Sequence, residues 1–355
     1  MTLGIRRVSL TDDRAEILDI LNRNFGAGQE RRFDWLYIDN PAGEAWAWLA
    51  WDHDKTVGTA AVFPRRMLVD GKLVLCGQVG GFAVDASHRS LGPAVLLQRA
   101  TFGPVDSGAL TFCYDCPPND RGMATFDRLG MRPNCEIARY ALPLRSDAFL
   151  EKRLGKSIWV KPVVATANLL LDIRTRSRIS QGLEIDALPG GFGDEFSELD
   201  RRVSSSGTIR ASRSADLLNW RFRKNATADP QVFVARRAGE LLGFVAFWSS
   251  GEAAYVIDLF GVELDTVGVA LLETAVEACK REEVCSLNGF CSEDSWLKAL
   301  FESSGFRSRE RGAKVVAYEK STGHFPKVLH HGLRWTFGHL EEAVSEQTDF
   351  IAVAR

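Results

Sequence analysis

The residues best suited to chemistry lie in one stretch of the chain, Val79-Gly-Gly-Phe-Ala-Val84-Asp-Ala-Ser-His-Arg89-Ser-Leu-Gly92-Pro-Ala94. Its pattern predicts a strand, then a turn that contains Arg89 and Gly92, then a helix. The first N–H groups of a helix have no partner within the helix, and the helix dipole adds about half a positive charge at that end. The stretch therefore predicts a site for a phosphate or pyrophosphate, with Gly92 allowing close approach to the backbone. The alternative is an ordinary helix-start turn whose arginine is paired locally.

Residues downstream of this turn strengthen the hypothesis. Asn119 lies eleven residues before Gly130-Met131, and the aromatic Phe126 lies four residues before that glycine. Together with the Arg89-x-x-Gly92-x-Ala94 turn, this pattern resembles the GNAT superfamily of N-acyltransferases. The resemblance covers residues 4–143 well and residues 182–320 more loosely.

The resemblance implies a site for coenzyme A, with acetyl-CoA or another acyl-CoA as co-substrate. In that family the turn holds the pyrophosphate, and the pantetheine arm lies in a wedge where the fourth and fifth strands splay apart. Phe82 and Val84 would then offer backbone groups to the pantetheine amides, and Asn119 would lie beside the fifth strand. The pyrophosphate turn would be lined by Arg89, Ser90, Gly92 and Ala94.

Acyl transfer to an amine requires a base for the ammonium, donors for the oxyanion and, in some enzymes, an acid for the leaving thiolate. Many family members use a tyrosine four residues before the Gly-apolar pair as the acid, but this chain has Phe126 there. Tyr114 and Tyr140 are then the available phenols. Asp115 is the best placed carboxylate for the base, and Asp85 is the second. The alternatives are that Asp115 caps a turn or helix and that Asp85 is a solvated loop residue.

The elements that must position these residues occur twice. Trp35 to Asn40 and Trp220 to Asn225 both span five residues, and both tryptophans precede a glycine, Gly58 or Gly243, by 23 residues. Two further pairs of segments repeat in the same order, Leu91–Ala94 with Val267–Ala270 and Phe126–Met131 with Phe301–Phe306. Repeats this long predict a duplicated domain, since solenoid units are shorter.

The two copies differ at the predicted cofactor turn. The second copy reads Asp265-Thr-Val-Gly268-Val-Ala270, so that an aspartate replaces Arg89, and Asp294 replaces Asn119. A carboxylate repels a diphosphate. We therefore expect coenzyme A to bind in the first copy only, and the second copy to shape the acceptor site or to stabilise the first.

The fold expected is α/β (α+β), with two tandem GNAT-like domains, each a mixed, mostly antiparallel sheet flanked by helices. Asp70-Gly71 between two apolar runs predicts a hairpin turn. We expect an acyl-CoA-binding domain at residues 1–145, a linker with a helix at 146–181, a degenerate second domain at 182–320, and a docking tail at 321–355.

Composition narrows the function classes. The net charge of −2 gives no basic field for nucleic acid or anionic lipid. The N-terminus has no apolar signal region, and the longest apolar stretch, at 163–171, is too short to span a bilayer. Seven cysteines favour reduced thiols, and Cys113-Tyr-Asp-Cys116 lacks the second pair of a four-cysteine zinc site. We expect a cytoplasmic protein without a metal, a nucleic-acid partner or a membrane span.

The sequence thus favours an acyl-CoA-dependent N-acyltransferase, with acetyl-CoA as donor and an amine of a small molecule or sugar as acceptor. Its tandem form looks most like GNAT-type proteins of bacterial surface polysaccharide synthesis. Two alternatives stay open, a Fem-type transferase that uses acyl carrier protein or aminoacyl-tRNA, and a non-catalytic scaffold of the same fold. The acceptor, the acyl chain length and the oligomeric state stay open as well.

Overall fold

The structure is a computed structural model. It describes residues 3–89, 91–117, 120–145, 182–204, 206–224, 229–320, 329 and 334–336. The linker expected at 146–181 and nearly all of the tail expected at 321–355 lie outside these residues. Below, the first half means residues 3–145 and the second half means residues 182–320. The division into domains at these boundaries stays a prediction.

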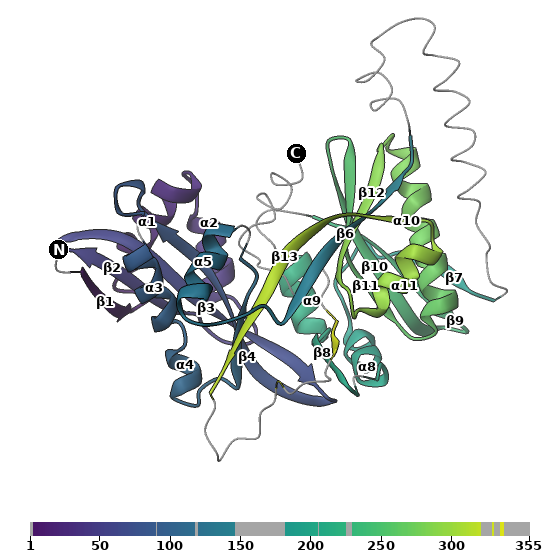
Figure 1. The fold of residues 1–355 in the computed structure, drawn as a ribbon. Helices are drawn as coiled ribbons and strands as arrows, with labels where there is room; N and C mark the ends of the chain where they lie inside the picture. The colour runs from purple at the N-terminus through teal and green to yellow at the C-terminus, as the bar shows by residue number, and fades with distance from the viewer. Residues whose placement is uncertain are drawn as a thin grey trace, which may run out of the picture.

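Both halves contain strands and helices, and in each half three strands follow one another directly, β2 to β4 and β9 to β11 (Figure 1). The elements of the first half are β1 (Leu3–Val8), α1 (Arg14–Phe25), α2 (Glu30–Phe33), the π-helical turn η1 (Asp34–Ile38), β2 (Trp46–Asp52), β3 (Lys55–Val69), β4 (Lys72–Val84), the 3₁₀ turn η2 (Ala86–His88), α3 (Leu91–Ala100), α4 (Gly103–Asp106), β5 (Phe112–Asp115), α5 (Asp120–Arg128) and β6 (Cys135–Pro143). The later elements are β7 (Glu184–Ala187), α8 (Asp194–Arg202), β8 (Thr208–Ala211), α9 (Ala215–Phe222), β9 (Gln231–Arg237), β10 (Glu240–Ser250), β11 (Ala253–Gly261), the π-helical turn η3 (Leu264–Gly268), α10 (Val269–Arg281), β12 (Ser286–Ser292), α11 (Trp296–Ser303), β13 (Arg307–Glu319) and β14 (Arg334–Trp335).

The described strands form one sheet of 14 strands. Its main path runs β1-β2-β3-β4-β5-β13-β6-β12-β11-β10-β9-β7, and the two ends have the same internal order. The pairs β4–β5 and β11–β12 are parallel, and their neighbours on both sides are antiparallel. This confirms the expected mixed, mostly antiparallel sheet with helices on its faces.

The two halves exchange their last strands, which the sequence did not predict. β13, from the second half, pairs with β5, and β6, from the first half, pairs with β12. β6 and β13 also pair with each other at the centre of the sheet, where they cross between the halves in Figure 1. Neither half therefore completes its sheet with its own strands.

Separate apolar cores lie on the two faces of each half. In the first half, α1 and η1 cover one face with Leu21 and Trp35, and α3 and α5 cover the other with Leu97 and Phe126. In the second half, α8 and α9 cover one face, and α10 and α11 cover the other. A central core joins the halves and includes residues of both together with the crossing strands: Tyr114, Ile137, Tyr255, Phe290 and Val315. No helix among the described residues is long and apolar enough to cross a bilayer.

Candidate active site

β4 and β5 separate soon after they meet. Their parallel pairing consists of Gly77 with Cys113 and Gln78 with Tyr114. Beyond Gln78, β4 continues to Val84 along β3, whereas β5 continues to Asp115 along β13. The edge of β4 that faces β5 is therefore left without a strand partner from Val79 onward, as the predicted wedge requires.

A β-bulge lies in β4 at the mouth of this wedge. Ala61 pairs with Gly80 and Thr59 pairs with Ala83, so that β4 has one residue more than β3 between the two pairs. Within the bulge, Gly81 has a φ of 56°, a left-handed conformation that favours glycine. A bulge bends the strand and leaves backbone groups outside the ladder, which is why bulges often lie beside functional sites.

The predicted phosphate turn follows β4 and is open to solvent. Arg89 is exposed, and its Nε donates a hydrogen bond to the carbonyl oxygen of Val84 at 3.3 Å. Gly92 is exposed in the first turn of α3, and Ala94 is partly buried in the same turn. The guanidinium and the first N–H groups of α3 thus lie at one end of the wedge. Ser90, also predicted for this turn, lies outside the described residues.

Asp85 anchors this turn to α1. Its carboxylate accepts hydrogen bonds from Arg23 Nη1 at 2.6 Å and from Asn24 Nδ2 at 3.0 Å, and the residue is buried. His88 contacts Asp52 of β2, with 3.3 Å between Nε2 and Oδ2. Asp85 is therefore neither a solvated loop residue nor a free base, and its ion pair holds the start of the turn in place.

Tyr114 and Asp115 end β5, but successive residues of a strand point to opposite faces. Tyr114 is buried in the central core that joins the halves, near Phe112. Asp115 is partly exposed, and its charge acts on the thiol of Cys113, which faces the core under α3 and α5. Burial, and then this carboxylate, raise the pKa of Cys113, so the thiol is not a nucleophile.

The structure does not bring the other predicted residues together at the wedge. Tyr140 lies on β6, which β13 separates from β5, and its ring stacks on Phe301 of α11 in the core of the second half. Burial raises the pKa of Tyr140 to about 12. Phe126 lies on α5, and its ring is buried in the core that this helix covers. Asn119 lies outside the described residues. Phe82 and Val84 do lie on β4 beyond the point of separation, where they were expected.

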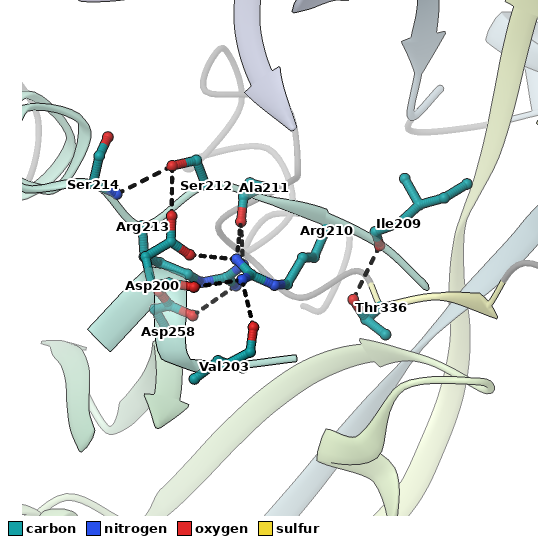
Figure 2. Close-up of polar contacts among 10 residues, drawn as sticks. All are labelled: Asp200, Val203, Ile209, Arg210, Ala211, Ser212, Arg213, Ser214, Asp258 and Thr336. Carbon is teal, nitrogen blue, oxygen red and sulfur yellow. Dashed lines mark hydrogen bonds and ion pairs between the residues drawn. The ribbon is translucent and has the colours of Figure 1, made fainter. Parts of the chain in front are cut away.

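The equivalent place in the second half is filled. β11 has a bulge between its pairs with Phe247 and Ala246, where Ile257 is the extra residue and Asp258 lies directly beside it. Its carboxylate accepts two hydrogen bonds from Arg213, at 3.1 and 3.2 Å, and both residues are buried (Figure 2). The turn that follows is also covered, because a Cβ on Gly268 would lie 2.9 Å from a side-chain carbon of Leu300.

A second buried ion pair lies beside the first in Figure 2 and fixes β8. Arg210 pairs with Asp200 of α8 and donates to the carbonyl oxygens of Val203 and Ala211. Ser212 Oγ also donates to Asp200 Oδ2, at 2.7 Å. Breaking such a pair leaves a buried charge uncompensated. These groups are engaged with one another, which favours a structural role for this cluster. Among the described residues, no group of His, Cys, Asp and Glu could hold a metal ion.

Two polar groups at or near the first bulge were not predicted as site residues from the sequence. The hydroxyl of Tyr37 and the amide nitrogen of Gln78 are buried, and neither has a hydrogen-bond partner within the described chain. One signal could have revealed Tyr37. In the repeat that begins at Trp35 and Trp220, Tyr37 corresponds to Phe222, so the hydroxyl occurs in one copy only.

Comparison with known proteins agrees with this geometry. Residues 5–113 match the family model of the acetyltransferase (GNAT) domain. No curated protein matches the chain. A solved structure from Enterococcus faecalis V583, described as a probable N-acyltransferase, is similar with a TM-score of 0.65 and 12% identity over 90% of this chain and 73% of that chain.

Two further solved structures share the fold. A GCN5-related N-acetyltransferase from Anabaena variabilis has a TM-score of 0.63 at 13% identity, over 89% of this chain and 72% of that chain. N-myristoyltransferase from Saccharomyces cerevisiae with bound myristoyl-CoA has a TM-score of 0.56 at 12% identity, over 89% of this chain and 82% of that chain. The fold is thus shared with these N-acyltransferases, and the match to the acetyltransferase (GNAT) domain covers residues 5–113, which include β4 and the turn at Arg89.

Proposed function

We propose that the chain is an acyl-CoA-dependent N-acyltransferase that binds acetyl-CoA in its first half and acylates an amine of a small molecule or sugar. One observation carries the proposal. The wedge between β4 and β5 opens beside an exposed helix-start turn with Arg89, within the region that matches the acetyltransferase family. A sugar amine of surface polysaccharide synthesis is the narrower form of the proposal, and it rests on the tandem sequence pattern.

The residues at the wedge fit coenzyme A. Arg89 and the first N–H groups of α3 supply positive charge and donors for the pyrophosphate. The edge of β4 at Phe82 and Val84 lacks pairing with β5, and its backbone groups are suited to the amides of the pantetheine arm. Bound acyl-CoA supplies an activated thioester, and no metal is required for its attack by an amine.

The chain's own part in the reaction is to hold the amine and remove its proton. We assign the removal of this proton to the carboxylate of Asp115, which ends the strand bordering the wedge and is partly exposed. Tyr114 points to the opposite face, toward the second half. We keep Tyr114 as a candidate acid on that face of the sheet. Tyr140 is the least suited of the predicted catalytic residues, because it packs in the core of the second half.

The second half supports the first in this proposal. The paired Asp258 and Arg213 lie beside its own bulge, and Leu300 covers its turn at Gly268, so it is not suited to a second cofactor. Its β13 borders β5 directly. The second half thereby supports β5, the strand that forms one side of the wedge. We propose that it also serves as a scaffold for the binding of the acceptor.

Native mass spectrometry of the purified protein, with acetyl-CoA added at increasing concentration, tests the cofactor. We expect one acetyl-CoA per chain. A thiol-release assay with a panel of amines, including amino sugars and polyamines, then tests turnover, with Arg89→Glu as the negative control. Failure of the parent protein to retain acetyl-CoA or coenzyme A would reject the proposal.

A further inference from the structure

The hydroxyl of Tyr37 is an unusual feature of the first half. The side chain is 2% exposed, and its oxygen has no hydrogen-bond partner within the described chain. Buried hydroxyls are nearly always paired, because leaving one unpaired loses the hydrogen bonds it makes with water. An unpaired buried hydroxyl therefore indicates that the partner is something other than the chain.

The surroundings of Tyr37 aim this hydroxyl at the bulge of β4. Its ring stacks on Phe33 at 4.5 Å between centroids and meets Phe63 edge to face at 5.0 Å. The π-helical turn η1 fixes its direction, and such turns are frequent at functional sites. A Cβ on Gly81 would lie 2.3 Å from the hydroxyl oxygen, so only a glycine leaves room for it.

A small apolar cavity lies at the same point. It has room for little more than one water-sized group. Tyr37 and Gly81 border it, and its apolar wall is formed by Leu21, Phe25, Phe33, Leu36 and Phe63. A polar donor at a cavity of this size suits a single small acceptor atom, such as the carbonyl oxygen of an acyl thioester.

The amide of Gln78 extends this polar edge. Gln78 lies on the last residue pair before β4 and β5 separate, and its Oε1 accepts hydrogen bonds from Arg65 Nε and Nη2 at 3.0 and 2.8 Å. Its Nε2 is buried and has no partner within the described chain. Two unpaired donors thus lie along β4 where the wedge opens, the amide of Gln78 and the hydroxyl of Tyr37, which lies next to Gly81.

We propose that Tyr37 is an acyl-recognition residue, whose hydroxyl donates a hydrogen bond to the carbonyl oxygen of a short acyl thioester at the β4 bulge. This inference rests on the proposed function. The interaction forms and breaks no covalent bond. The hydroxyl acts as a donor and not as a base, because burial raises the pKa of Tyr37 and keeps its proton in place.

The second half offers a natural contrast. There, Phe222 takes the place of Tyr37 in the repeat, and the bulge of β11 has Ile257 as its extra residue in place of a glycine, next to Asp258, which is paired with Arg213. The hydroxyl and the bulge glycine Gly81 occur in the same half as the exposed Arg89 turn. Tyr37, Gly81 and the cofactor turn at Arg89 are therefore present together in the first half, and all three are changed in the second half.

Tyr37→Phe tests the inference, because it removes one oxygen and keeps the ring. Titration calorimetry compares acetyl-CoA with S-ethyl-CoA, a thioether of similar size that lacks the carbonyl oxygen. We expect the parent to bind acetyl-CoA about fivefold more tightly, as one hydrogen bond allows, and Tyr37→Phe to bind both equally. Tyr318→Phe is the control, since that hydroxyl donates to Asp106 at 2.8 Å, and it should keep the parent's preference.

Three results would overturn the inference. Tyr37→Phe could keep the full preference for acetyl-CoA, or the parent could show none. Tyr37→Phe could also lower the urea midpoint of the ligand-free protein, which would show that the hydroxyl has a structural partner such as a buried water. If the parent binds neither compound, the proposed function fails along with it. If the parent binds acetyl-CoA and the variant behaves like the parent, only the role of Tyr37 fails.

Discussion

Trp35 and Trp220 donate their indole N–H groups to each other's main-chain carbonyl oxygens, both at 2.9 Å. Their rings lie 5.1 Å apart. The two residues hold the same position in the sequence repeat, so equivalent residues contact each other reciprocally, as they do across a two-fold interface. The exchange of β6 and β13 has the same symmetry. The chain thus resembles an intertwined dimer joined into one polypeptide, and this explains why the tryptophans recur.

Replacing either tryptophan by phenylalanine should destabilise the whole chain. Trp35→Phe leaves the carbonyl of Trp220 without its donor and removes buried ring volume, and Trp220→Phe does the same to Trp35. We expect each change to lower the free energy of unfolding by about 2 kcal/mol. Urea denaturation followed by fluorescence measures the loss.

A double-mutant cycle separates this contact from two independent losses. Trp35→Phe/Trp220→Phe should lose less stability than the two single changes together, because the residues contact each other. Trp46→Phe combined with Trp220→Phe should be additive, since Trp46 packs on the other face of the sheet. Additivity of the Trp35 and Trp220 pair as well would show that the reciprocal contact is energetically unimportant.

Coenzyme A should bind once per chain. The exposed turn with Arg89 has a counterpart in which Gly268 is buried against Leu300 and Arg213 pairs with Asp258 at the bulge. Titration calorimetry should give a stoichiometry of one. Asp265→Arg restores the charge of the second turn but not its space, so it should leave the stoichiometry at one. Two equal sites in the parent, or a cofactor found at Gly268, would contradict this prediction.

Arg89→Glu should weaken cofactor binding without unfolding the protein. The side chain is exposed, and exposed substitutions usually change stability little. Charge reversal beside a diphosphate should lower the affinity for coenzyme A at least about tenfold. Arg99→Glu, at the exposed far end of α3, is the matched control and should bind like the parent. An unchanged dissociation constant for Arg89→Glu would reject the pyrophosphate assignment.

Local patterns made part of this molecule predictable. Asp70 and Gly71 form the expected turn, and both have positive φ values, of 48° and 77°. The helix that begins at Leu91 and the end of β4 at Val84 also follow the prediction. In these places the signal is short in sequence, because turn residues and helix starts are set by the backbone conformations that they allow.

Features that depend on distant residues could not be predicted. The exchange of β6 and β13 joins strands that are far apart in the sequence, and no local pattern in either strand identifies its partner. Asp85 reads as a loop residue in the sequence, and only the folded chain brings Arg23 to it. Likewise, the position of the Tyr37 hydroxyl at the bulge depends on its contact with Gly81, which is far away in the sequence.

Asp115 should matter for turnover more than Phe126 does. Asp115 ends the strand that borders the wedge and is partly exposed, and we propose that its carboxylate accepts the proton of an incoming ammonium directly or through one water. Phe126 is buried in the core under α5, and a phenyl ring has no proton to give, so its part is packing. Asp115→Asn should therefore lower kcat/KM by about a hundredfold or more, which is the effect of losing a general base. Phe126→Tyr should keep the rate within a few fold, or raise it where the added hydroxyl reaches the thiolate.

Both variants should be measured with a confirmed acceptor from about pH 6 to 9, the span over which such bases titrate. If Asp115→Asn keeps the rate and pH profile of the parent, the base lies elsewhere or the amine arrives already neutral.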